Sequence, residues 1–306
     1  RVTKAITLIG ESRDGVIIDT TSTTTRGIYV NADNVSISNI TLLGPANYGL
    51  KAEGYTNLSL NNVKVTGCTN GTGVDLNGVN TATLTNIESV NNSKNGIALT
   101  DCSNIVINNM TTKGNSWGGL AIYAAGKWYD GGCNDITINQ TDLTAISSIY
   151  SGMANGYTIT NLNLPAEYKY AVKNLVYKPE NTSYFTSLDQ AILAATSVDH
   201  PQDSYIGAIN TNNNALLDNS HLYVGDGMEI QTSINQVASA GKVNVESGTY
   251  QGNLFVNKPV TISGNISNTG AASNAPIIEG NNNLGNGFVI ESNDITIEGF
   301  QIQNFE

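Results

Sequence analysis

The stretch GVDLNGVNTATLTNIESV, residues 73–90, contains the pattern that decides the fold. Apolar side chains alternate with polar ones after Gly73, again from Ala82 to Leu84, and a third time from Ile87 to Val90. Alternation with a period of two places every second side chain on one face of a strand. The stretch therefore predicts three short strands in succession, with no helix between them.

The same pattern recurs along the first half of the chain. It reads GIYV at Gly27, GLKA at Gly49, GIAL at Gly96 and GLAI at Gly119, and consecutive copies, Gly73 included, are 22, 24, 23 and 23 residues apart. A unit of this size buries its apolar face only by stacking on its neighbours. We therefore predict an all-β fold, a right-handed parallel β-helix with about 23 residues per coil and short capping helices. A leucine-rich repeat would need an L-x-x-L-x-L frame, which the sequence lacks.

An asparagine closes the second strand of successive coils. Asparagine tolerates left-handed backbone and forms local hydrogen bonds, which suits the tight bend between two strands. Because the coils stack, we predict that these residues form an internal structural ladder: Asn39, Asn62, Asn86 and Asn109.

With its glycine steps and bend asparagines, the chain resembles the pectin-lyase-like superfamily. It is most similar to the short β-helix repeats found in many bacterial and archaeal surface proteins. The resemblance covers residues 2–164 and 223–306 and implies the parallel β-helix fold. It implies no single function, because the superfamily includes lyases, hydrolases, epimerases, phage tailspikes, adhesins and surface-layer proteins.

The coil pattern stops and then restarts. We predict a first β-helix over residues 1–164, a cap and linker with a short helix over 165–222, and a second β-helix unit over 223–306. The first of the two expected helices has Ser187 as N-cap, and the second begins at Asp226 and stops at Gly241. KPVTISG from Lys258 repeats KAITLIG from Lys4, and the sequence from Gly287 repeats that from Gly27. Residue 1 therefore need not be a natural N-terminus.

Composition excludes several classes of partner and site. Among 306 residues only 13% are charged, the net charge is −11, and no run of Lys or Arg could neutralise phosphates, so nucleic acid is excluded. No apolar stretch is long enough to span a bilayer. Cys68, Cys102 and Cys133 lack zinc spacing and are expected to be small buried residues. Acidic loops such as DGVIID from Asp14 would suit calcium but lack EF-hand spacing, so we predict no cofactor and no metal ligand.

The outward-facing positions of the predicted coils form three columns. The first contains Tyr29, Lys51, Asp75, Ala98 and Ala121, the second Ser36, Ser59, Thr83, Val106 and Thr137, and the third Thr41, Lys64, Glu88 and Thr111. Polysaccharide lyases need clustered carboxylates and a nearby base, and no two acids stack in adjacent coils of one column. We therefore interpret Lys51 and Asp75 as an exposed salt bridge. The second column is too narrow, and is interrupted at Val106, for an ice-binding array.

One coil is longer than the others, and its extra residues contain an aromatic cluster. Both tryptophans of the chain fall here, together with a tyrosine, a lysine and an acid: Trp117, Lys127, Trp128, Tyr129 and Asp130. Exposed aromatic rings can stack on sugars. A loop folded against the helix flank explains the same residues, so both interpretations stay open.

Two functions follow from these features. The first is a structural extracellular or cell-surface protein, such as a surface-layer, sheath, filament or adhesin stalk, that associates with copies of itself. The second is a polysaccharide-binding or polysaccharide-cleaving domain that uses the aromatic loop with Asp101 and Lys113. The tandem unit and the absence of an acid cluster favour the first.

Overall fold

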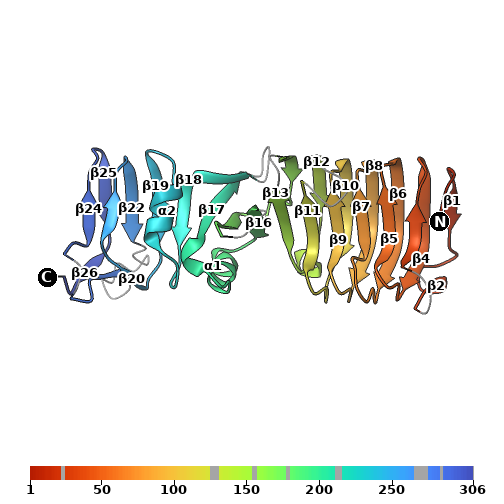
Figure 1. Cartoon of the computed structure of the whole chain (residues 1–306), viewed down its shortest axis with the longest axis horizontal. Helices are drawn as coiled ribbons and strands as arrows, with labels where there is room; N and C mark the ends of the chain where they lie inside the picture. Colours follow the sequence, from red (N-terminus) through yellow and green to blue (C-terminus); the bar gives the residue numbers. More distant parts are fainter. Residues whose placement is uncertain are drawn as a thin grey trace. The chain divides into compact units, whose positions relative to one another are not determined.

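The computed structural model describes residues 1–21, 25–124, 131–153, 157–176, 180–210, 216–264, 275–282 and 285–305. Two compact units make up the chain (Figure 1). Unit 1 contains Arg1–Ala166, and unit 2 contains Glu167–Asn210 and Leu216–Glu306. The segment after residue 166, expected to be a cap and linker, is thus part of unit 2.

Unit 1 is a stack of parallel strands that form two main sheets. The first, here the A sheet, has the order β13-β11-β9-β7-β5-β3, and the second, the B sheet, runs β1-β4-β6-β8-β10-β12-β14, with β2 paired to the second half of β4. The strands of the A sheet are β3 (Arg26–Val30), β5 (Tyr48–Glu53), β7 (Val74–Asn77), β9 (Asn95–Thr100), β11 (Gly118–Tyr123) and β13 (Ile149–Met153). Those of the B sheet are β1 (Thr7–Ile9), β2 (Ile17–Asp19), β4 (Val35–Leu43), β6 (Thr56–Thr66), β8 (Asn80–Val90), β10 (Ser103–Thr111), β12 (Cys133–Asn139) and β14 (Ile159–Asn163). A short 3₁₀ helix, η1, covers Leu143–Ala145.

The apolar positions of the glycine-led pattern form the core of unit 1. Leu50 pairs with Val74, Val74 with Ile97 and Ile97 with Leu120, so each step along the stack is one predicted coil. These side chains are fully buried, as are Leu60, Leu84 and Ile107 opposite them. The prediction of an all-β right-handed parallel β-helix is therefore confirmed.

The bend asparagines adopt the expected backbone but not the expected burial. Asn39, Asn62, Asn86 and Asn109 all have left-handed φ values of 53–56°, and each lies inside one long B-sheet strand rather than between two strands. Asn62 donates a hydrogen bond to Asn39 at 2.9 Å. However, Asn86 and Asn109 are exposed, because left-handed backbone at this corner turns the side chain outward. The predicted internal position is thus wrong for these residues.

A pair of hydrogen-bonded asparagines, of which Asn92 is buried and Asn115 is half-buried, lies at the opposite corner of the coil. The Asn92 carboxamide accepts from the Cys68 backbone N–H at 3.1 Å and donates to the Asn115 Oδ1 atom at 2.9 Å. Asn115 in turn donates to the Ser89 carbonyl at 2.8 Å. The three thiols are buried and free, as expected. Asn92 and Asn115 therefore satisfy the Cys68 N–H and the Ser89 carbonyl at this corner, whereas the buried Ser93 hydroxyl there has no hydrogen-bond partner among the described residues.

Unit 2 combines antiparallel strands with a second set of parallel coils. Its largest sheet has the order β25-β22-β19-β18-β17-β15-β16, antiparallel from β16 to β18 and parallel from β18 to β25; β20-β23-β26 and β21-β24 form the other faces. The elements are β15 (Tyr170–Asn174), β16 (Glu180–Phe185), α1 (Leu188–Thr196), η2 (Pro201–Asp203), β17 (Ser204–Asn210), β18 (Leu216–Val224), α2 (Ile230–Gln236), β19 (Gly241–Val245), β20 (Thr249–Gln251), β21 (Leu254–Val256), β22 (Val260–Gly264), β23 (Ile277–Glu279), β24 (Phe288–Ile290), β25 (Ile295–Glu298) and β26 (Gln301–Gln303).

The helix caps agree with the sequence at α1 and differ at α2. Ser187 accepts from the Gln190 N–H and caps α1, as predicted. Asp226 does not cap α2, because Gly227 at φ +87° forms a turn there, and the helix begins only after Glu229. The helix also ends at Gln236 rather than at Gly241, because Val237 is already extended and buried in the core.

The two units share one coil with the same strand pairing. Thr7 pairs with Ser36 in unit 1 as Thr261 pairs with Thr296 in unit 2. Ile17 pairs with Thr41 as Ile277 pairs with Gln301, and Val2 pairs with Val30 as Val256 pairs with Ile290. The repeat seen in the sequence is therefore a repeat of structure on all three faces of the coil.

Candidate functional site

The predicted aromatic cluster is only partly described by the structure. Trp117 directly precedes β11, and 57% of its surface is exposed. The Lys94 ammonium lies 4.8 Å from the centre of its ring. Lys127, Trp128, Tyr129 and Asp130 lie outside the described residues. Asp101 occupies the bend after β9 and Lys113 follows β10, so these two lie at different corners of the coil.

The outer face of the A sheet carries the densest set of interacting polar and aromatic side chains that we find in unit 1. Register places one outward column as the sequence predicted and extends it to Tyr150: Tyr29, Lys51, Asp75, Ala98, Ala121 and Tyr150. A second outward column beside it contains Glu53, Asn77, Thr100 and Tyr123. We call these two columns, with Arg26, Tyr48 and Asn95, the A-sheet face.

An ionic network occupies the β3–β7 end of the A-sheet face. The Lys51 ammonium lies 2.5 Å from Asp75 Oδ2 and 3.2 Å from Glu53 Oε1. Tyr29 donates its hydroxyl to Glu53, and Asn77 donates to Asp75 at 2.8 Å. Lys51 therefore pairs with both carboxylates of this network, Glu53 and Asp75.

The network is buried, although its side chains point away from the core. Lys51 and Asp75 are only 6% and 7% exposed. The expectation of an exposed salt bridge is therefore wrong. The Tyr48 ring lies 4.3 Å from the Lys51 ammonium and excludes water from it, and the Arg26 guanidinium lies 4.4 Å from the Tyr29 ring.

Burial and pairing fix the protonation of this network. Burial alone would lower the pKa of Lys51, but the Asp75 carboxylate outweighs it and raises that pKa above its ordinary value. Burial would raise the pKa of Glu53, but the Tyr29 hydroxyl and the Lys51 charge lower it instead. Both groups stay ionised at neutral pH. The network can attract a charged group, and it holds its own side chains in fixed positions. Lys51 is poorly suited to accept a proton, because it is already protonated at neutral pH.

Two tyrosines and an asparagine form a second cluster at the β9–β13 end of the face. Tyr150 donates to Asn95 Oδ1 at 2.9 Å, across the intervening strand β11. Its ring meets that of Tyr123 edge to face, with the centroids 5.7 Å apart, and the two hydroxyls are hydrogen-bonded. The Tyr150 ring passes over Gly118 of β11, which pairs with Asn95 and where an added Cβ would lie 3.5 Å from Tyr150 Cε1. Burial raises the pKa of Tyr150, and the neighbouring Tyr123 adds to this effect.

Two open depressions lie elsewhere on the described surface. One, of about 320 Å³ in unit 1, is lined by residues that include Arg13, Glu88 and Asp142, and Glu88 there pairs with Lys64 at 2.7 Å. The other, of about 460 Å³ in unit 2, is lined by Tyr223, Lys242, Asn244, Glu246, Ser263, Gly264 and Glu298. Among the described residues no three His, Cys, Asp or Glu side chains gather as metal ligands would. Over the same residues, the helices are too short or too polar to span a bilayer.

The family follows from comparison with known proteins. A family model described as a right-handed beta helix region matches residues 9–173, which is more than half of the chain. The chain therefore belongs to this family of β-helical proteins. No curated protein and no solved structure matches the chain.

Proposed function

We propose that the chain is a structural module of an extracellular or cell-surface protein, in which tandem β-helix units build a surface layer, sheath, filament or adhesin stalk. The observation that carries this proposal is the repeated coil, whose three faces have the same pairing in both units. A repeat of this kind extends a protein by stacking and suits a load-carrying or spacing role.

The side chains of the A-sheet face support the same proposal. Lys51 forms ion pairs with both Glu53 and Asp75, and the hydroxyls of Tyr123 and Tyr150 bond to each other and to Asn95. Groups that satisfy one another stiffen the sheet and leave little reactivity for an incoming substrate. The face therefore has the properties of a rigid wall.

Self-association is the testable part of this proposal. Sedimentation velocity of the full chain over a wide range of concentration should give an apparent mass that rises with concentration. The copies that we propose as partners would produce such a rise by mass action. A single monomeric species at every concentration would contradict self-association.

Polysaccharide binding is the second candidate, and one observation favours it. Trp117 keeps an exposed ring with Lys94 beside it, and it borders the A-sheet face near Tyr150. Aromatic rings at the edge of a sheet can stack on sugars. Trp117→Ala should then reduce retention on a panel of acidic and neutral glycans. Tyr157→Ala, which removes an exposed aromatic ring just before the B-sheet strand β14, is the matched control. Equal retention by both variants would exclude a role for Trp117.

A further inference from the structure

The coil shared by the two units is buried to different extents in them. Ile6 is 40% exposed in unit 1, whereas its counterpart Val260 is 1% exposed in unit 2. The other inward positions differ in the same direction. Val2, Leu8 and Ile18 are half-buried, and their counterparts Val256, Ile262 and Ile278 are fully buried.

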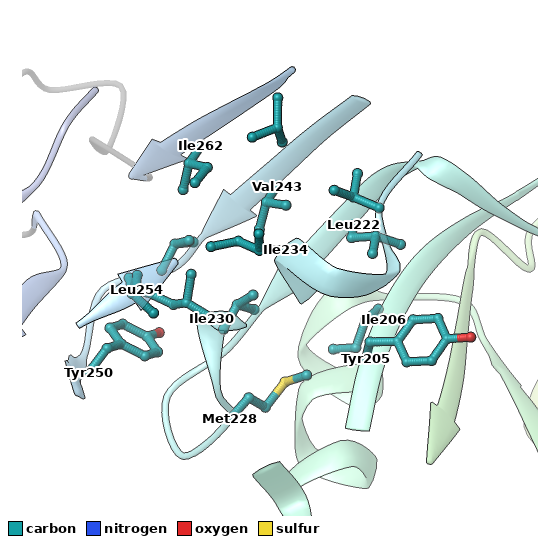
Figure 2. Packing of buried hydrophobic residues seen from close by; sticks show 14 of the residues in the cluster. Tyr205, Ile206, Leu222, Met228, Ile230, Ile234, Val243, Tyr250, Leu254 and Ile262 are labelled. Atoms are coloured by element: carbon teal, nitrogen blue, oxygen red, sulfur yellow. The ribbon is translucent and has the colours of Figure 1, made fainter. Parts of the chain in front are cut away.

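In unit 2 the covering elements are α2 and the strands that follow it. Val243 of β19 pairs with Ile262, and Tyr250 of β20 pairs with Ile278. Figure 2 shows the side chains of Ile230 and Ile234 from α2 directed into the same cluster. A helix with two strands of this kind therefore buries the apolar end of the coil.

Polar contacts hold the same helix in place. The Lys258 ammonium donates to the carbonyls of Asn235 and Val237, at 3.0 and 2.6 Å, where α2 ends. These carbonyls lack partners within the helix, and a cation is favourable beside them. Gln231 accepts from the Phe255 N–H at 2.8 Å and donates to its carbonyl at 3.1 Å, which pairs the free edge of β21.

Unit 1 retains the lysine that performs this task. Lys4 is the counterpart of Lys258 in the repeated segment, KAITLIG against KPVTISG. Its side chain is exposed, and within the described part of the chain it makes no hydrogen bond or ion pair. The contacts of the A-sheet face involve neither the apolar end of the coil nor Lys4. The apolar end of the coil and Lys4 are the two features that hold a helix and its strands in unit 2: an apolar surface to pack on, and a lysine that donates to the last helix carbonyls.

We propose that the end of the first coil in unit 1, formed by Val2, Lys4, Ile6, Leu8 and Ile18, is a docking surface for a capping segment. The segment has the chemistry of residues 223–254: an amphipathic helix whose last carbonyls accept from Lys4, followed by a strand that pairs along β1. This inference rests on the shared coil and is independent of the proposed function. It concerns the surface itself, whatever chain adjoins Arg1.

The test is to supply the segment. A second copy of residues 223–254 is added before Arg1 in the full chain, so that its last residue precedes Arg1 as Leu254 precedes Phe255. Hydrogen exchange of the β1 and β2 amides, read by mass spectrometry, should slow by roughly tenfold or more. The thermal midpoint of unit 1 should rise. The control fusion carries Ile230→Asp and Ile234→Asp in the added copy only, and should give neither effect.

Two further variants separate packing from the lysine contact. Lys4→Gln should speed exchange in the fusion and leave the unfused chain unchanged. Lys258→Gln in the unfused chain should speed exchange of α2 and β22, which tests the contact where it is observed. Equal exchange in the fusion and its control would overturn the proposal. Strong protection of β1 in an unfused, self-associated chain would also overturn it, because a second copy would then occupy the surface.

Discussion

Replacement of Asn92 by alanine should destabilise unit 1 far more than its position in a bend suggests. The change removes the only acceptor that the structure gives the buried Cys68 N–H, and also the donor to Asn115. A buried group left unsatisfied costs about 1–3 kcal/mol, and one lost hydrogen bond adds about 1 kcal/mol. We therefore expect a loss of about 3 kcal/mol, or a fall in the melting temperature of roughly 6–12 °C for a unit of this size.

Tryptophan fluorescence during thermal or urea unfolding reports this change selectively. Both tryptophans of the chain, Trp117 and Trp128, fall within the sequence of unit 1. Asn61→Ala is the matched control, because this side chain is exposed on β6, and its loss should change stability by less than about 0.5 kcal/mol. If Asn92→Ala shifts the midpoint no more than Asn61→Ala does, the hydrogen bonds of Asn92 do not support the coil.

Four further predictions concern the ionic network, the coil glycines and the thiols. Lys51→Met should cost about 3–5 kcal/mol, because it leaves the buried Asp75 carboxylate and the half-buried Glu53 carboxylate without their cation. The lowered pKa of Glu53 means that its contribution is present above the ordinary value of 4.5 and is lost as pH falls below it. As the pH is lowered through the acid range, the urea midpoint of Glu53→Gln should therefore fall less steeply than that of the unsubstituted protein. Gly73→Ala should cost about 2–4 kcal/mol of stability, because the added carbon would lie 1.9 Å from Ser89 Oγ. Gly67→Ala is the control: the added carbon would lie 3.6 Å from its nearest neighbour, so only the positive φ of this residue should cost stability, roughly 1 kcal/mol. The three thiols should resist an aromatic disulfide reagent in the native state and react after denaturation, since burial raises the pKa of Cys68 to about 12 and of Cys133 to about 11.

The coil could be predicted from sequence because its signal is periodic. Gly49, Gly73 and Gly96 recur with apolar residues at fixed offsets, and stacking identical coils leaves one arrangement of strands. The outward columns followed from the same register, which the strand pairing reproduces. The left-handed bend at Asn62 was also predictable, because few other residues tolerate that backbone.

The burial of the site and the shape of the middle segment could not be predicted. Lys51 is buried because Tyr48 folds over it, and no pattern in the sequence encodes which way a tyrosine ring turns. Asn92 was missed because its column holds different residue types, with Cys68 on one side and Asn115 on the other. The antiparallel strands β15 to β18 have few apolar residues in alternation, so their pairing depends on contacts with each other rather than on local pattern.

Electron cryomicroscopy of the parent protein in its natural assembled state tests the central claim most directly. Each unit should appear as a stack of coils, with layers of density spaced by about 4.8 Å along it. We predict that such units pack into a regular layer, sheath or filament. Isolated particles with no regular packing would contradict the claim.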